Sequence, residues 1–101
     1  MECLPARGGI PGPAGELEVW LECPKTDLRG VLLIAHPHPL YGGSMHNKVV
    51  HTLARAALNQ GLAALRFNFR GVGESDGEHD QGIGEQLDLL TVAAWIRTEL
   101  P

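Results

Sequence analysis

Residues 30–36 read GVLLIAH, and this stretch decides the fold. Its apolar side chains follow one another without the alternation that a half-buried strand shows. A parallel strand that is covered by helices on both faces has this continuous apolar character. Pro37 and Pro39 cannot donate to a strand ladder, so the strand must end near His36. The stretch therefore predicts an α/β fold, with a loop over 36–43 at the edge of the sheet where such folds bind ligands.

A helix and a second strand are predicted after this loop. Ser44 is a typical N-cap residue, and the pattern indicates a helix over 45–59 with Gly61 as its left-handed stop. One stripe of this helix is apolar and comprises Val49, Val50, Leu53, Ala54, Ala57 and Leu58. Residues 62–69 are again typical of a strand. The two strands and the helix form a βαβ unit, which we expect to be right-handed.

The segments on either side of this unit carry different signals. The first fifteen residues are rich in glycine and proline, which is typical of irregular chain with tight turns. Residues 17–23 alternate in polarity and predict a half-buried strand that Pro24 stops. Residues 70–84 contain five glycines and indicate a loop, and a second helix is expected over 84–99.

Length and composition limit the classes of protein to consider. A chain of 101 residues makes one small domain at most, and its net charge of −4 argues against broad nucleic-acid binding. The longest apolar run covers 31–35, too short to span a membrane, and residues 1–15 lack the layout of a secretory signal. The only cysteines, Cys3 and Cys23, show no metal-binding spacing. We therefore expect free thiols and a cytoplasmic location.

Acidic and basic residues are separated along the chain. Residues 28–73 contain arginine and lysine but no aspartate or glutamate, whereas 74–90 contain six acidic residues and no basic one. We favour the interpretation that these are two solvated faces that attract each other. The alternative is a positively charged surface that draws anionic substrates.

The sequence GESDG at 73–77 matches the G-x-S-x-G pattern of a serine hydrolase nucleophile elbow. In such an elbow the serine lies on a strained turn directly between a strand and a helix. Here the preceding strand ends at Phe69, and Ser75 is followed by further loop residues instead of a helix. We therefore predict that Ser75 forms hydrogen bonds within a loop and is not the nucleophile.

The segment His36-Pro37-His38-Pro39 has three interpretations. The two histidines could bind a metal ion together with His46, His51, Asp76 or Asp80, although His46 and His51 do not share a helix face. Alternatively, the His38 backbone N–H, the only one that the 37–39 triplet offers, could stabilise an oxyanion. The glycines at 42 and 43 would then let the chain approach a ligand closely. The third interpretation is a rigid turn that only joins strand to helix.

Four stretches together resemble a known family: IAHPHPLYGG at 34–43, NKVV at 47–50, RFNFRGVGES at 66–75, and DQGIGE at 80–85 with its continuation to residue 96. They are similar to the predicted bacterial α/β-hydrolase group related to dienelactone hydrolases. The resemblance covers essentially the whole chain. It implies the amino-terminal part of an α/β-hydrolase fold, with a mostly parallel sheet that starts antiparallel, one βαβ unit and a second helix, as a single partial domain over 1–101.

The resemblance also implies where the catalytic groups lie. The residue that matches His38 supplies an oxyanion-hole N–H in such proteins, and the loop that contains Ser75 follows the fourth strand. The nucleophile, the acid and the catalytic histidine belong to sequence beyond Pro101. The strand over 31–35 would lie between the fourth and fifth strands, so one of its edges lacks a partner here. An unpaired apolar edge favours association with another chain.

We therefore expect the parent protein to be a cytoplasmic serine hydrolase that acts on an ester, a thioester or a similar acyl bond. It would need no metal or other cofactor, and the isolated chain would be inactive. Tyr41, His46 and Arg70 would lie near the mouth of the site and contact the small-molecule substrate, or serve the structure alone. Partners would be a second copy or the remaining half of the domain, not nucleic acid or membrane. The alternatives are a non-catalytic interaction module that uses the open edge or the acidic loop 74–88, and a metal-dependent hydrolase that uses His36 and His38.

Overall fold

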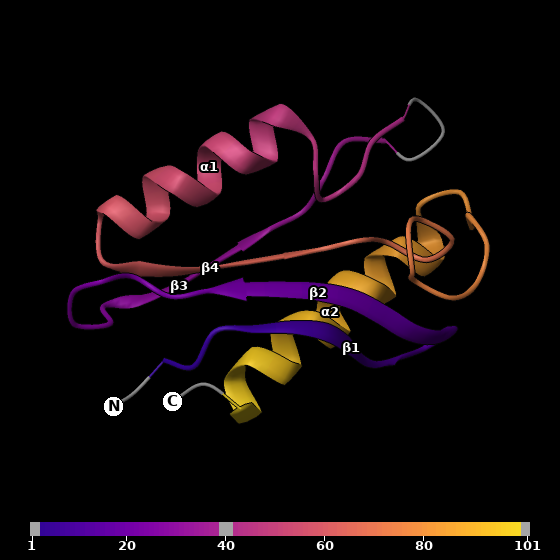
Figure 1. The fold of residues 1–101 in the computed structure, drawn as a ribbon. Helices are drawn as coiled ribbons and strands as arrows, with labels where there is room; N and C mark the ends of the chain where they lie inside the picture. Colours follow the sequence, from indigo (N-terminus) through magenta and orange to yellow (C-terminus); the bar gives the residue numbers. More distant parts are fainter. Residues whose placement is uncertain (1–2, 39–41, 100–101) are drawn as a thin grey trace.

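The computed structural model describes residues 3–38 and 42–99 (Figure 1). Four strands and two helices occur in the order β1 (Ala6–Gly12), β2 (Gly15–Glu22), β3 (Gly30–Ile34), α1 (Lys48–Asn59), β4 (Leu62–Phe67) and α2 (Ile83–Glu99). The strands form one sheet in the order β1-β2-β4-β3. No helix among the described residues is both long enough and apolar enough to cross a membrane.

The sheet is mixed. β3 pairs with β4 in parallel and β2 pairs with both β1 and β4 in antiparallel orientation, so the parallel part is the β3–β4 pair alone. α1 joins these two parallel strands, which confirms the predicted βαβ unit. Among the described strands, β3 has only β4 as a neighbour and therefore forms one edge of the sheet.

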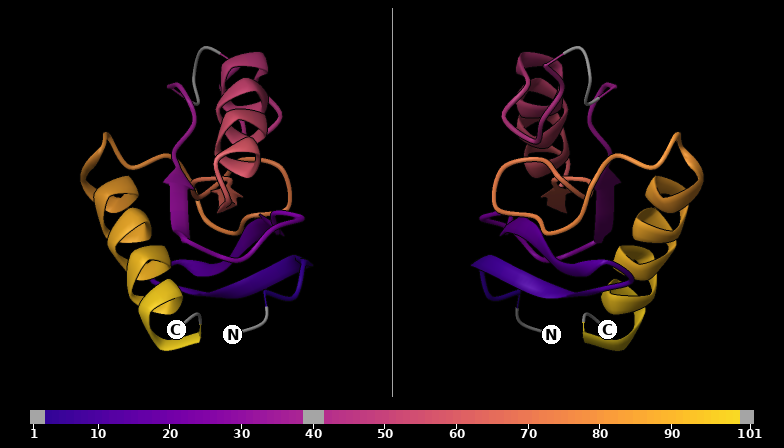
Figure 2. Two further views of the ribbon diagram at one scale, coloured as in Figure 1. Left: turned by 90° about the vertical axis from the view of Figure 1, so that its left-hand side faces the viewer. Right: turned by 90° about the vertical axis from the view of Figure 1, so that its right-hand side faces the viewer.

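The two helices cover opposite faces of the sheet (Figure 2). Along β4, Ala63, Leu65 and Phe67 pack in a core that contains Val92 of α2, whereas Ala64 packs in a second core with α1. The residues of β3 also alternate between the two cores: Val31 and Leu33 pack against the first, and Leu32 and Ile34 pack in the second. This arrangement explains the sequence of β3, because a strand that is covered on both faces needs apolar residues at every position.

Three boundaries differ from the sequence-based expectations. Residues 6–12 form β1 instead of irregular chain, because the backbone of β2 provides a ladder partner and an edge strand tolerates proline. α1 begins at Lys48, three residues later than expected, and its N-cap is Asn47, whose side chain accepts from the Val49 N–H at 2.8 Å. The strand expected to reach residue 69 ends at Phe67.

The cysteines also differ from expectation, since Cys3 and Cys23 form a disulfide. The reason is the register of the β1–β2 hairpin, in which Ala6 lies opposite Leu21. Continuing this register by three residues brings position 3 opposite position 24, next to Cys23. The Cα atoms of the two cysteines are 5.8 Å apart, within the range that a disulfide bridges.

Candidate active site

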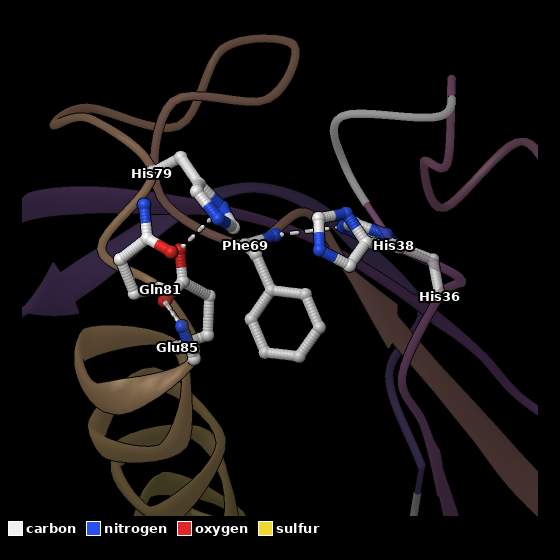
Figure 3. A pocket seen from close by; sticks show the side chains of 7 residues that line it. His36, His38, Phe69, His79, Gln81 and Glu85 are labelled. Carbon is white, nitrogen blue, oxygen red and sulfur yellow. Dashed lines mark hydrogen bonds and ion pairs between the residues drawn. The ribbon is translucent and has the colours of Figure 1, made fainter.

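A pocket of about 300 Å³ lies at the carboxyl ends of β3 and β4 (Figure 3). Three segments form its wall: the residues after β3, the residues after β4, and the turn that leads into α2. The lining residues are His36, His38, Phe69, His79, Gln81, Gly82 and Glu85. This is the edge at which open α/β sheets bind ligands, and it is where the loop after β3 was expected to form a site.

His36 is buried and joins the ends of the two parallel strands. Its Nε2 accepts from the Phe69 N–H at 3.0 Å, and its Nδ1 lies 2.7 Å from the Pro37 carbonyl oxygen, to which it donates. Burial lowers the pKa of His36, against the opposing effect of the Pro37 hydrogen bond. Because both ring nitrogens of this neutral imidazole are occupied, His36 does not fit a metal site. No cluster of three potential metal-ligating side chains occurs within 3–38 and 42–99.

We expect the protein to lose stability as the pH falls below about 6.5, the ordinary pKa of histidine, in part because of His36. The folded state disfavours the protonated imidazole. The contribution of His36 is therefore complete above its ordinary pKa of 6.5 and is lost as the pH falls through the lowered value. Urea unfolding of the His36→Gln variant should show a weaker dependence on pH over this range. His51→Gln, at an exposed position of α1, should keep the dependence of the unmodified protein. Equal slopes for all three proteins would contradict this role.

Asn68 anchors the chain between His38 and α1. Its Oδ1 accepts from the Met45 N–H at 2.8 Å, and its Nδ2 donates to Glu18 Oε1 at 2.7 Å. The Met45 carbonyl oxygen accepts from Arg66 at 3.3 Å. These contacts join the turn before α1 to β2 and β4. The loop that carries His38 is therefore held at its far end by buried side chains of the sheet.

Gly43 closes this loop and should tolerate no side chain. Its N–H donates to the His38 carbonyl oxygen at 3.2 Å, and an added Cβ would overlap the Pro37 carbonyl group. We expect Gly43→Ala to displace the Pro37 carbonyl group and to lower the free energy of unfolding by about 1–3 kcal/mol, because the added methyl group has no space there. Gly42→Ala is the matched control, since an added Cβ meets no atom within 4 Å there, although its φ of +79° still strains alanine. Urea unfolding measures both variants, and equal free energies of unfolding would contradict the prediction.

His38 lies exposed at the rim of the pocket, and its ring centroid is 5.2 Å from that of His79. Its position, at the carboxyl end of β3 and on the pocket wall, is the one expected for an oxyanion donor. The role of its backbone N–H stays a prediction. Tyr41 lies outside the described residues.

The turn before α2 is built around the buried carboxylate of Glu85. Its two oxygens accept from the Asp80 N–H at 2.8 Å and from the Gly82 N–H at 2.9 Å. His79 Nδ1 lies 3.1 Å from Glu85 Oε2, at ion-pair distance but without hydrogen-bond alignment. Burial alone would raise the pKa of Glu85, but these backbone hydrogen bonds and His79 outweigh it and lower the pKa. The carboxylate therefore stays ionised at the floor of the turn.

Arg70 faces α2 instead of the pocket. Its Nε and Nη2 donate to the two carboxylate oxygens of Asp88 at 3.1 and 2.9 Å, and its backbone N–H donates to the same carboxylate at 3.0 Å. Nη2 also donates to the Gly84 carbonyl oxygen at 2.9 Å. The hydrogen bond to Asp88 raises the pKa of Arg70, although burial opposes it. These contacts fulfil the structural role that the sequence left open for Arg70.

His46 also lies away from the pocket lining. Its ring centroid is 6.2 Å from that of Trp20 on β2, and its backbone N–H donates to Ser44 Oγ at 3.1 Å. The sequence grouped His46 with the mouth of the site because it follows the same loop. Its side chain instead lies near Trp20, in the antiparallel part of the sheet.

Ser75 has the loop-holding role that the sequence predicted. Its Oγ donates to the Asn68 carbonyl oxygen at 2.6 Å and accepts from the Glu18 N–H at 2.8 Å. The residue is buried, and α2 begins only at Ile83. A nucleophile needs an accessible hydroxyl next to a general base, and Ser75 has neither.

Proteins of known structure share the fold of this chain and much of its sequence. No family model matches the chain. It is 49% identical to an α/β serine hydrolase homologue from Coxiella burnetii, with a TM-score of 0.87, over 92% of this chain and 45% of that one. It is 42% identical to a Xanthomonas campestris protein described as an α/β serine hydrolase without a lid, with a TM-score of 0.90, over 98% of this chain and 47% of that one. The chain has the fold of the amino-terminal half of an α/β hydrolase.

A further relative also matches nearly the whole of this chain but only part of its own length. An uncharacterized protein of Rickettsia prowazekii is 39% identical over 90 residues, which are 89% of this chain and 38% of that protein. The chain thus spans less than half the length of the relatives named here. The pocket described above lies at the carboxyl ends of β3 and β4 within this half of the fold.

Sequence reasoning missed Asn68, His79, Gln81 and Glu85. Asn68 directly follows a buried strand, and this position alone is a signal for a site residue. Glu85 lies three residues after Gly82, a spacing like that of a helix capping box, which could have identified the turn. His79 and Gln81 had no local signal, because they enter the pocket only through the folding of that turn.

Proposed function

We propose that this chain is part of a serine hydrolase that acts on an ester, a thioester or a similarly activated acyl group. The observation that carries the proposal is the 42–49% identity, over nearly the whole chain, to solved proteins described as α/β serine hydrolases or their homologues. The pocket after β3 supports it, because it lies at the edge where this fold does its chemistry. Membership of the group related to dienelactone hydrolases is part of the same proposal.

In the proposed reaction, a serine outside these 101 residues attacks the acyl carbonyl carbon and a histidine accepts its proton. The tetrahedral intermediate then carries a negative oxygen, which backbone N–H groups stabilise. When it collapses, the bond to the alcohol or thiol breaks and this leaving group takes the proton from the histidine. Water then cleaves the acyl–serine bond, with the histidine again accepting and returning a proton. We assign one of these donors to His38, and the residue after the serine would supply the other. His36 and Asn68 act through His38 as positioning residues, since they hold the two ends of its loop. No metal or organic cofactor takes part in this scheme.

The test is to react the full-length protein with p-nitrophenyl esters and a fluorophosphonate probe. We expect ester hydrolysis and one labelled serine that is not Ser75. Ser75→Ala should reduce stability, because it removes hydrogen bonds to Asn68 and Glu18, and should still be labelled. No label on any serine of the full-length protein would overturn the proposal.

We also propose that β3 and the helices present a surface for association. β3 has one pairing edge open among the described strands, and five large apolar side chains on the helices are exposed: Val49, Leu53, Ile83, Leu87 and Leu90. The occupant is the remaining half of the domain or, for residues 1–101 alone, a second copy. Sedimentation of residues 1–101 alone should show association or aggregation. A monodisperse, thermally robust monomer would contradict this proposal. It would also argue against the non-catalytic interaction module, because that module uses the same sheet edge.

The cytoplasmic location likewise remains a proposal. The low number of cysteines in the sequence supports it, because proteins of reducing compartments rarely depend on disulfides. The disulfide between Cys3 and Cys23 argues in the other direction, because disulfides persist mainly in oxidising compartments. The thiol state of the protein taken directly from cells would decide between the two.

A further inference from the structure

Gln81 adopts a backbone conformation that glutamine rarely takes. Its φ is +56°, and it is the only residue other than glycine with a positive φ within 3–38 and 42–99. For a residue with a Cβ this left-handed region is strained, whereas glycine enters it freely. Strained residues of this kind cluster at functional sites, where the surrounding structure holds them in place.

The surrounding contacts explain how Gln81 is held. The residues on either side of it, Asp80 and Gly82, both donate their backbone N–H to the carboxylate of Glu85. This carboxylate is buried, so the turn cannot relax without breaking two charge-assisted hydrogen bonds. Glycine would fit the turn with less strain. The backbone therefore gives no reason for a glutamine at this position.

The side chain of Gln81 supplies a reason. It lines the pocket together with His79 and Glu85, on the wall opposite His36 and His38 (Figure 3). A side-chain amide offers both hydrogen-bond donors and an acceptor. Phe69 contributes the apolar part of the lining. A ligand in this pocket would thus meet the Phe69 ring, the Gln81 amide and the side chains of His38 and His79.

We propose that Gln81 determines substrate specificity, by hydrogen bonding a hydroxyl or amide group on the acyl part of the substrate. This inference rests on the proposed hydrolase function. The preferred substrate class is therefore an acyl ester that carries a hydroxyl or amide group, not a plain alkyl ester.

The first test compares two esters that differ by one hydroxyl, p-nitrophenyl butyrate and p-nitrophenyl 3-hydroxybutyrate, with the full-length protein. We expect Gln81→Gly to lower the ratio of kcat/KM for the hydroxy ester over the plain ester about tenfold, the usual effect of one lost hydrogen bond. The same variant should unfold at a higher temperature, because glycine relieves the strain. Gln86→Ala, at an exposed position outside the pocket, should leave the ratio unchanged. An unchanged ratio in Gln81→Gly would overturn the proposal.

The second test does not depend on hydrolysis. Titration with 3-hydroxybutyramide should shift the NMR signals of the Gln81 side-chain amide in a saturable way, and Gln81→Gly should lose the binding. If the amide binds in this way but neither ester is hydrolysed, the specificity pocket stands and the proposed hydrolase function fails. If the Gln81 signals do not move at millimolar concentrations of the probe, the proposal is wrong.

Discussion

Replacing Asp88 with asparagine is expected to lower the free energy of unfolding by about 3–5 kcal/mol. Asp88 is fully buried on α2, and its carboxylate accepts three hydrogen bonds from Arg70, two from the guanidinium and one from the backbone. Asparagine keeps the volume but turns one acceptor into an N–H₂ group that faces the donors of Arg70. The guanidinium, whose side chain is only 11% exposed, would lose its nearest counter-charge and keep only the exposed Asp80 carboxylate at 3.9 Å, and a poorly paired buried charge is costly.

Asp80→Asn is the matched control, because it removes a carboxylate near the same guanidinium. Asp80 is 54% exposed and its Oδ2 lies 3.9 Å from Arg70 Nη1, so its loss should cost less than about 1 kcal/mol. Urea unfolding of both variants in the full-length protein measures the difference. If the two variants differed by less than about 1 kcal/mol, the Arg70–Asp88 pair would not be what holds the loop after β4 to α2.

The elements that the sequence predicted well are those whose own residues contain the signal. The apolar run at 31–35 predicted a strand covered on both faces, and β3 confirms this, because Val31 and Leu33 pack against one core and Leu32 and Ile34 pack in the other. β1 was missed because its glycines and proline carry no strand signal. It forms because β2 offers a pairing partner, which is a tertiary effect that local composition does not contain.

The candidate site shows the same limit. The Pro-His-Pro segment places His38 at the end of β3 from local rules alone, and the spacing around Ser75 correctly indicated a loop residue. Arg70 could not be assigned from sequence, because its partner Asp88 lies 18 positions later on a helix. Gln81 enters the pocket through a turn that the buried Glu85 organises. Contacts between distant residues thus decide the side-chain roles that the sequence left open.

Loss of the disulfide is expected to destabilise the protein by about 3 kcal/mol. Cys3 and Cys23 are 20 positions apart, and linking them restricts the unfolded chain while it clamps the open end of the β1–β2 hairpin. That hairpin forms the edge of the sheet opposite β3 and contributes Ile10, Leu17 and Val19 to the core beneath α2. The double variant Cys3→Ser/Cys23→Ser should therefore unfold at a lower urea concentration than the oxidised protein.

A reducing agent provides the internal control for this prediction. It should lower the unfolding midpoint of the unmodified protein to that of the double variant, and it should leave the double variant unchanged. If the protein isolated without a reducing agent titrates two free thiols and its midpoint does not respond, the bond does not form and the cytoplasmic proposal is strengthened. If the reducing agent lowers the unfolding midpoint as expected, the stability of the hairpin depends on an oxidising environment. A reducing compartment would then remove about 3 kcal/mol from a domain whose total stability is only about 5–15 kcal/mol.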